Sequence, residues 1–288
     1  MDFDSFNNIK WDIIKQKLSS AKTVKSTRRN DGVYYDISVS FDTETTSMYQ
    51  GTPQEKFSFM YVWQFGIDGY YCYGRHWSEF IKLLLKLKEY GGLSTEKKLI
   101  IYIHNLSFEF QFFRKLIPWT NIFAVDNREP VKALSSWGIE FRDSLIVSGY
   151  KLANVAKNLT KHKIPKMVGD LDYTLIRNTK TSFTEKELGY MLNDVRILIA
   201  YIDEQRVQYG DIAHIPLTNT GRVRQLVRKN CFGKTWDSRS KYLNIMKVLQ
   251  LSKADYIESK KAFAGGFTHA TPNKVGGTFN NVSSIDFT

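Results

Sequence analysis

Aromatic and β-branched residues gather in three short segments between residues 34 and 73, and turn-forming residues such as Asp68-Gly69 separate them. Side chains of these types fit a half-buried pleated surface, so each segment predicts a strand, and the close spacing favours an antiparallel meander. The predicted strands cover residues 34–41, 57–65 and 70–73. Further short apolar runs predict strands at residues 98–103, 131–134 and 139–142.

Helical periodicity marks other segments, and it predicts helices at residues 9–18, 77–90, 105–116 and 150–159. A longer helix is expected after Thr184-Glu185-Lys186-Glu187, which has the form of a capping box. At about 100° per residue, Tyr190 and Asp194 lie roughly 120° from the centre of its apolar stripe, so we expect both to face a cleft. Strands mixed with helices predict an α/β fold with a mixed central sheet flanked by helices.

Four carboxylates and one tyrosine are the candidate chemical groups. Asp42 and Glu44 stand two apart at the end of the first predicted strand, so both side chains project from one face. Tyr190 and Asp194 stand four apart, about one helical turn. Glu109 falls in the N-terminal half of the helix predicted at 105–116. Such carboxylates suit two divalent cations roughly 3.5 to 4 Å apart, which predicts hydrolytic phosphoryl transfer.

Three ordered segments contain these groups, namely Phe41-Asp42-Thr43-Glu44-Thr45, Asn105-Leu106-Ser107-Phe108-Glu109 and Tyr190-Met191-Leu192-Asn193-Asp194. They resemble the motifs of 3′-5′ exonucleases of the DEDD type, in the tyrosine-bearing subclass, which have an RNase H-like fold. Further segments resemble the protein-primed family B DNA polymerases of phages and linear plasmids. These are Tyr102-Ile103-His104-Asn105-Leu106, Asp143-Ser144-Leu145, Gly169-Asp170-Leu171-Asp172-Tyr173 and Gly265-Gly266-Phe267-Thr268.

The resemblance implies a two-metal site for Mg²⁺ or Mn²⁺, held by Asp42, Glu44, Glu109 and Asp194. It also implies that Tyr190 orients the attacking water, because a phenol with a pKa of about 10 suits hydrogen bonding better than proton abstraction. The side chains implied to touch a single-stranded 3′ end are those of Thr45, Tyr102, His104, Asn105, Phe108, Ser144, Leu145 and Tyr173. Gly265 and Gly266 would bring the backbone close to primer-template DNA.

Three positions depart from the family pattern. Glu109 stands where the second motif usually has Asp, and its extra methylene moves the carboxylate by about 1.3 Å, on the order of a C–C bond. Val168 replaces a lysine, and Lys166, two residues earlier, shares a face with it if the stretch is extended. Phe263 replaces the tyrosine of the family's Tyr-x-Gly-Gly linker.

The last residues, Ser284-Ile285-Asp286-Phe287-Thr288, resemble the opening of polymerase motif A, whose Asp, here Asp286, would bind metal in the palm. Later palm motifs do not follow, so we expect an exonuclease region of a longer polymerase that does not polymerise DNA by itself. The implied partners are a terminal priming protein and the polymerase palm. The predicted domains are an N-terminal helix and linker (1–31), the exonuclease (32–210) and a basic helical linker with the start of the palm (211–288).

Charge supports a nucleic-acid partner. The chain of 288 residues has a formal net charge of +12, and residues 206–288 contain 13 Lys and Arg against 5 Asp and Glu. Cys72 and Cys231 lack the spacing of a zinc site or a disulfide scaffold. The acidic N-terminus and the lack of a long apolar run predict no secretion and no membrane span, so a cytoplasmic location is expected.

Two rival functions stay open at this point. In the first, Glu109 and Val168 mark a decayed active site, and the chain only binds single-stranded DNA or docks another protein. In the second, the chain is an exoribonuclease of the same fold, because the sequence does not settle how a 2′-hydroxyl is treated.

Overall fold

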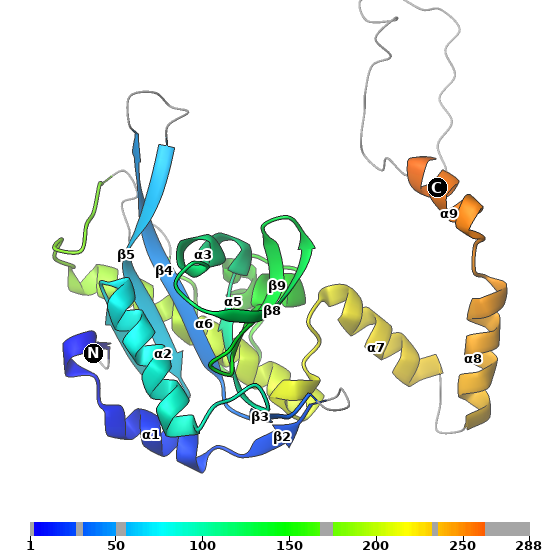
Figure 1. Cartoon of the computed structure of the whole chain (residues 1–288), viewed down its shortest axis with the longest axis horizontal. Helices are drawn as coiled ribbons and strands as arrows, with labels where there is room; N and C mark the ends of the chain where they lie inside the picture. Colours follow the sequence, from blue (N-terminus) through cyan, green and yellow to red (C-terminus); the bar gives the residue numbers. More distant parts are fainter. Residues whose placement is uncertain (1–2, 27–30, 50–55, 168–174, 232–235, 263–288) are drawn as a thin grey trace, which may run out of the picture. The chain divides into compact units, whose positions relative to one another are not determined.

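The computed structural model describes residues 3–26, 31–49, 56–167, 175–231 and 236–262 (Figure 1). The chain divides into two compact units, Met1–Leu226 and Val227–Thr288. The first unit contains the sheet and the helices that pack on it. The second contains α8 (Trp236–Val248) and α9 (Lys253–Ala262), and α7 (Asn219–Cys231) runs across the division. The proposed domain boundaries after residues 31 and 210 stay predictions.

A mixed sheet organises the first unit (Figure 1). Its strand order is β1-β6-β5-β4-β7-β10-β9-β8, and β3 pairs with β7 and β2. β4, β5 and β6 form the predicted antiparallel meander, whereas β7 runs parallel to β4 and β10. The bounds are β1 Asp4–Ser5, β2 Thr23–Lys25, β3 Val33–Tyr35, β4 Val39–Tyr49, β5 Lys56–Ile67, β6 Tyr70–Gly74, β7 Lys97–Ile103, β8 Trp119–Asp126, β9 Glu129–Ser135 and β10 Ile139–Asp143. The predicted α/β class is confirmed, and the order β6-β5-β4-β7-β10 is that of an RNase H-like fold.

Helices cover both faces of this sheet, with α2 on one side and α6 on the other (Figure 1). β7 shows why the sequence permits this. Ile101 and Ile103 pack with α1, α2 and α3, whereas Ile100 and Tyr102 pack with α5 and α6, because successive strand residues point to opposite faces. The helices are α1 Trp11–Ser20, α2 Trp77–Gly91, α3 Leu106–Phe113, α4 Ser144–Ser148, α5 Leu152–Asn158 and α6 Glu185–Tyr209, with short 3₁₀ helices at Phe6–Asn8 and Ile212–His214.

The capping box predicted before α6 is confirmed. The Thr184 hydroxyl accepts a hydrogen bond from the Glu187 backbone N–H (3.2 Å), and the Glu187 carboxylate accepts one from the Thr184 backbone N–H (2.8 Å). Two otherwise unpaired backbone donors are thereby satisfied, which fixes the start of the helix. The register of α6 follows from this start, and with it the positions of Tyr190 and Asp194.

Some predicted elements were wrong. Residues 34–41 do not form one strand: β3 ends at Tyr35, and β4 begins at Val39. Between them the Asp36 carboxylate accepts hydrogen bonds from Arg206 Nε (2.9 Å) and the Ile212 backbone N–H (3.0 Å), which ties this segment to α6 and its end. β4 then continues to Tyr49, so Asp42 does not lie at the end of its own strand. β2 lies in the segment predicted as a linker, and β8 was not predicted.

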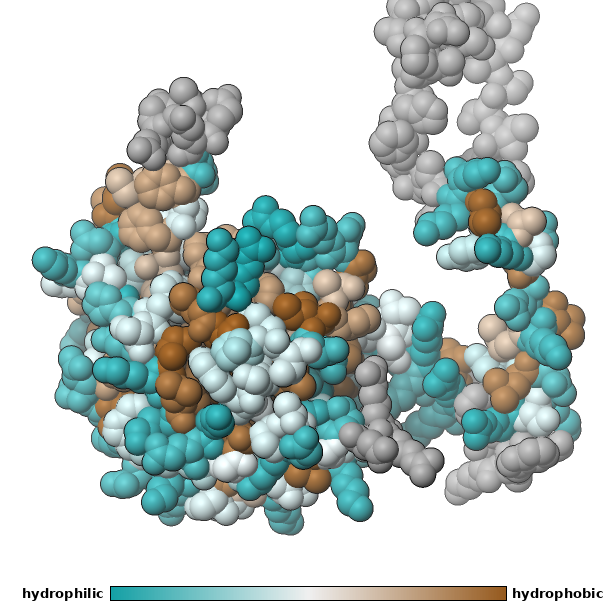
Figure 2. Space-filling view, viewed as in Figure 1, coloured by the Kyte–Doolittle hydropathy of each residue, from teal (hydrophilic) through white to brown (hydrophobic). Residues whose placement is uncertain are grey.

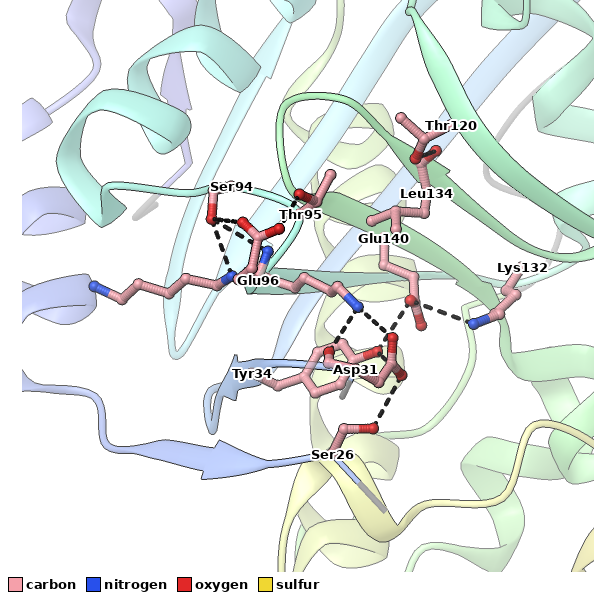
Figure 3. Close-up of polar contacts among 12 residues, drawn as sticks. Ser26, Asp31, Tyr34, Ser94, Thr95, Glu96, Thr120, Lys132, Leu134 and Glu140 are labelled. Atoms are coloured by element: carbon pink, nitrogen blue, oxygen red, sulfur yellow. Dashed lines mark hydrogen bonds and ion pairs between the residues drawn. The ribbon is translucent and has the colours of Figure 1, made fainter. Parts of the chain in front are cut away.

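A buried ionic network joins β3, β7, β9 and β10 at one end of the sheet (Figure 3). Glu140 is fully buried and pairs with Arg142 Nε (2.6 Å) and Lys132 Nζ (3.6 Å). The Tyr34 hydroxyl donates to Glu140 (3.2 Å), and Lys98 Nζ donates to the Asp31 carboxylate (2.6 Å). The pairing with Arg142 and Lys132 lowers the pKa of Glu140 in spite of its burial.

Apolar side chains are exposed around α3 and the β8–β9 hairpin, where Figure 2 shows hydrophobic residues on the surface. β8 is an edge strand whose Ile122, Phe123 and Val125 are exposed, as is Phe108 in α3. This uniform exposure removes the alternation of buried and exposed residues by which a half-buried strand is recognised, which is why β8 escaped prediction. No helix in the described parts of the chain is both long and apolar enough to cross a membrane.

Candidate active site

Three carboxylates meet between β4 and α6. Phe41 packs in the core on the α2 side, so its neighbour Asp42 points to the opposite face, and Glu44 follows on the same face as predicted. Asp194 reaches this face from α6. Carboxylate oxygens of Asp42, Glu44 and Asp194 lie within 4.8 Å of one another. β7 ends at Ile103, opposite Phe41, so the carboxylates lie where the neighbouring strand stops rather than where β4 does.

Glu109 approaches from the other side of β4. It lies on α3, which follows directly after β7, and its side chain is buried. The Thr43 hydroxyl, which alternates with Asp42 and Glu44 along β4, donates a hydrogen bond to Glu109 Oε2. Glu109 is therefore held on the strand that carries Asp42, although it lies outside the group of three whose oxygens are mutually within 4.8 Å.

The carboxylates repel one another in a buried place. Burial, with the charge of Asp194, raises the pKa of Asp42 to about 8. Burial and the charge of Asp42 also raise the pKa of Glu44 and of Glu109 well above the usual range, and burial raises that of Asp194. Buried like charges are unfavourable without cations beside them, and carboxylate oxygens are the ligands that Mg²⁺ and Mn²⁺ prefer. The acidic cluster fits a divalent metal on both counts.

Lys166 supplies a positive charge within the protein. Its ammonium group donates hydrogen bonds to both carboxylate oxygens of Asp194, at 2.6 Å for Oδ2, and it lies 4.1 Å from the centre of the Tyr190 ring. Tyr190 and Asp194 are one turn apart on α6, so one lysine contacts both. The charge of Lys166 lowers the pKa of Asp194 against the effect of burial. The lysine, Tyr190 and Asp194 thus form one contact group.

Arg177 is a second cation at the site, and the sequence did not point to it. Its side chain is buried, and its guanidinium pairs with Glu187 at the start of α6. Its charge opposes the rise in the pKa of Glu44 that burial and the neighbouring carboxylates cause. Its backbone N–H donates to the Thr46 hydroxyl (3.3 Å), which ties the segment before α6 to β4. Arg177 lies outside regular elements, so no periodicity could have placed it beside Glu44.

Asp143, which was singled out only as part of a matching segment, organises the ends of β7 and β10. Its carboxylate accepts from the backbone N–H groups of Leu145 (2.6 Å) and Ile146 (3.3 Å) at the start of α4, and from that of Leu106 (2.9 Å) at the start of α3. One side chain thereby fixes two helix starts beside the carboxylates. Asn105 between β7 and α3 adopts a left-handed conformation (φ 78°), which asparagine tolerates better than most residues.

His104 and Ser144 lie together at this edge, with His104 Nδ1 2.9 Å from the Ser144 hydroxyl oxygen. Burial, with the charge of Lys166, lowers the pKa of His104 to about 4, so the ring is neutral at physiological pH. Phe108 is 43% exposed on α3. Thr45 and Leu145 are half-buried.

Tyr102 and Ser144 differ from the other predicted DNA contacts among the described residues, because both are fully buried (0% exposed), Tyr102 in the core beneath α6. Neither side chain is exposed to a bound strand in this arrangement. Tyr173, Gly265, Gly266 and Asp286 lie outside the described residues, as do Val168 and Phe263.

The raised carboxyl pKa values predict a stability that depends on pH. A carboxyl group whose pKa is higher in the folded chain binds more protons there than in the unfolded chain, so its contribution to stability falls as pH rises from about 4 to about 8. Asp42→Asn removes one such group. In chelator, we expect its melting temperature to rise relative to that of the native chain across this range. A difference that stays constant with pH for Asp42→Asn would contradict the assignment.

Comparisons with known proteins identify the fold of this chain, through solved structures alone. No protein-family model matches the chain, and no curated protein matches it. Among solved structures, Phi29 DNA polymerase complexed with primer-template DNA and incoming nucleotides is 18% identical over 83% of this chain and 40% of that chain, with a TM-score of 0.51. Phi29 polymerase with single-stranded DNA (20% identity, 60% and 32% covered, TM-score 0.47) and the Aedes aegypti Nibbler EXO domain (12%, 78% and 94%, 0.43) also match.

The chain thus spans less than half the length of the Phi29 polymerase structures that it resembles. At 18% identity, the likeness with a TM-score above 0.5 establishes the fold. The chain shares its α/β fold with the part of Phi29 DNA polymerase that it matches, and a buried acidic cluster compatible with a divalent metal lies in that fold.

Proposed function

We propose that this chain is a metal-dependent 3′-5′ exodeoxyribonuclease that proofreads for a protein-primed family B DNA polymerase. The observation that carries the proposal is the convergence of Asp42, Glu44 and Asp194 within 4.8 Å, in the fold and motif order of such exonucleases. A water would attack the last phosphodiester, the bond to the 3′ oxygen of the preceding nucleotide would break, and a nucleoside 5′-monophosphate would leave.

Asp42, Glu44 and Asp194 would hold Mg²⁺ or Mn²⁺, with Glu109 beside Asp42 as a further carboxylate. Such an ion, when bound, supplies Lewis-acid stabilisation of the negative charge on the phosphate and a more acidic water. The chain's own residues position this group: Thr43 holds Glu109, Lys166 holds Asp194, and Arg177 offsets the charge of Glu44.

The strand end would lie along the edge where β7 and β10 stop. Phe108 offers an exposed ring for stacking on a base, and the amide of Asn105 can bond the strand. His104 is neutral and bonded to Ser144, so it suits hydrogen bonding to the strand rather than ion pairing with phosphate. Tyr190 would orient the attacking water.

The test of this proposal compares substrates. We expect a single-stranded DNA oligonucleotide to be shortened from its 3′ end, and a primer with a mismatched 3′ nucleotide to be shortened faster than a matched one. An RNA of the same sequence, digested in parallel, separates this activity from that of an exoribonuclease. Faster digestion of the RNA would overturn the DNA assignment, and equal rates on matched and mismatched primers would overturn the proofreading role.

Lys166 gives a prediction specific to this chain, because it occupies a position where the family pattern has no lysine. Lys166→Met removes the ammonium group from Asp194 and Tyr190, and we expect the rate of DNA hydrolysis to fall by about 10²-fold, the scale of losing one positioned catalytic partner. Lys163→Met, at an exposed lysine of the same segment, is the matched control. Equal rates for the two variants would show that Lys166 does not substitute for the family's lysine, which Val168 replaces in this chain.

A further inference from the structure

A pocket lies along α6, beyond the carboxylates and within the first unit. Its volume is about 540 Å³, within the range of small-molecule sites. Residues of α5, α6 and α7 contribute to it, together with the segment between α4 and α5 and the residues after α5. Its lining includes Tyr150, Lys161, Tyr201, Glu204, Gln205 and Arg222.

The pocket is aligned with the active site. Tyr201 and Gln205 follow Asp194 by seven and eleven residues, so they lie within about 20° of the same helical face, about 10 and 16 Å further along the axis. α4 makes a second connection: Ser144 at its start contacts His104, and Ser148 at its end lines the pocket. A strand bound at His104 would therefore have the pocket one short helix away.

Two buried polar atoms in the lining have no partner among the described residues. They are the Tyr201 hydroxyl and Gln205 Oε1, on side chains that are 8% and 7% exposed. Buried polar groups are normally hydrogen-bonded, and each exception calls for an explanation. A hydroxyl and an amide oxygen side by side on one helix face suit a ligand that carries an amino group.

The charged lining residues favour an anion. Lys161 and Arg222 both line the pocket, and no described residue forms an ion pair with either. The acidic member of the lining, Glu204, is already engaged: its Oε1 accepts from the backbone N–H groups of Thr160 (2.7 Å) and Lys161 (2.7 Å). Tyr150 is 52% exposed and presents a ring beside these charges.

From these contacts we propose that the pocket is a second nucleotide site, distinct from the active site. A base with an exocyclic amino group would bond Tyr201 and Gln205, and its phosphate would pair with Lys161 and Arg222. The ligand class rests on the proposed nuclease function. The same chemistry belongs to a free nucleoside monophosphate and to a nucleotide within the DNA strand, and the experiment separates these two sources.

The experiment uses the whole chain carrying Asp42→Ala with Glu44→Ala, in chelator, so that cleavage cannot interfere. Binding of dAMP, dTMP and a fluorescent oligo-dA is titrated. We expect dAMP to bind several-fold more tightly than dTMP, which has no amino group on its base. Tyr201→Phe should weaken dAMP binding about fivefold to tenfold, the effect of one hydrogen bond. Arg222→Ala should weaken it about tenfold, and Arg224→Ala, exposed on the same helix, should not change it.

If both site variants also weaken binding of oligo-dA, the site takes a nucleotide of the strand; if only dAMP binding changes, it takes the free nucleotide. Unchanged affinity for both ligands in Tyr201→Phe and Arg222→Ala would overturn the proposal. Misfolding does not explain a loss in Tyr201→Phe, because removing an unpartnered buried hydroxyl is expected to leave the melting temperature unchanged or higher. If neither variant changes binding but the native chain digests DNA, the proposed function stands without this site. If the variants weaken binding but the native chain does not digest DNA, the site stands and the proposed nuclease function fails.

Discussion

Replacing Asp42 and Glu44 together by alanine is expected to reduce hydrolysis of a single-stranded DNA oligonucleotide by about 10³-fold or more, as when groups that stabilise developing charge are removed. The two carboxylates come from one strand face, and with Asp194 they make up the acidic cluster. Their removal leaves one member of that cluster. The fold should survive, because the change removes buried like charges that repel one another and whose pKa values are raised.

The measurement is the rate of single-nucleotide release with magnesium or manganese, together with the melting temperature in chelator. Asp12→Ala with Glu89→Ala, two exposed carboxylates on α1 and α2, is the matched double variant and should digest DNA at the native rate. We expect the Asp42 and Glu44 variant to melt at or above the native temperature in chelator. If this variant folds and still digests DNA at the native rate, the acidic cluster takes no part in the reaction.

Glu140→Ala is expected to lower the free energy of unfolding by about 3–5 kcal/mol, the usual cost of removing one partner from a buried ion pair. Glu140 is fully buried and pairs with Arg142. It also bonds Lys132 and the Tyr34 hydroxyl (Figure 3). Its loss would leave the Arg142 guanidinium buried without its carboxylate partner. The network lies toward the end of β7 that pairs with β3, away from the carboxylate cluster. The expected effect of Glu140→Ala is therefore on stability rather than on DNA hydrolysis.

Urea unfolding in chelator measures this loss, and Glu129→Ala, at an exposed glutamate of β9, is the control. Replacing both members of the shortest pair, Glu140→Leu with Arg142→Leu, should cost less than Glu140→Ala, since the Arg142 guanidinium no longer stays buried without its carboxylate. A cost below about 1 kcal/mol for Glu140→Ala, on the scale of an exposed ion pair, would contradict the account of the network.

The sequence allowed the main elements to be predicted where periodicity or capping is strong. The start of α6 followed from its capping box, and the shared face of Asp42 and Glu44 followed from strand alternation. The end of β4 was missed because the strand continues past its neighbour β7 into a polar segment of threonines and serine. There the pattern of apolar residues stops but the pairing with β5 does not.

Contacts between distant segments could not be predicted from local pattern. The hydrogen bond from Thr43 to Glu109 joins residues 66 positions apart, and Arg177 reaches the site from an irregular segment. Lys166 was proposed from its spacing to Val168, and its contact with Asp194 depends on the path of the chain before α6. In each case local sequence indicates at most where a residue lies along its own segment, whereas the tertiary fold decides which distant side chain it contacts.

Whether this chain is a metal-dependent nuclease is decided by digestion of a 5′-labelled single-stranded DNA oligonucleotide by the native chain, with magnesium, with manganese and with chelator, resolved at single-nucleotide steps. We expect a ladder that shortens from the 3′ end with either metal and no products in chelator. Tight binding of the oligonucleotide without any ladder, at saturating metal, would contradict it and make this chain a DNA-binding domain without nuclease activity.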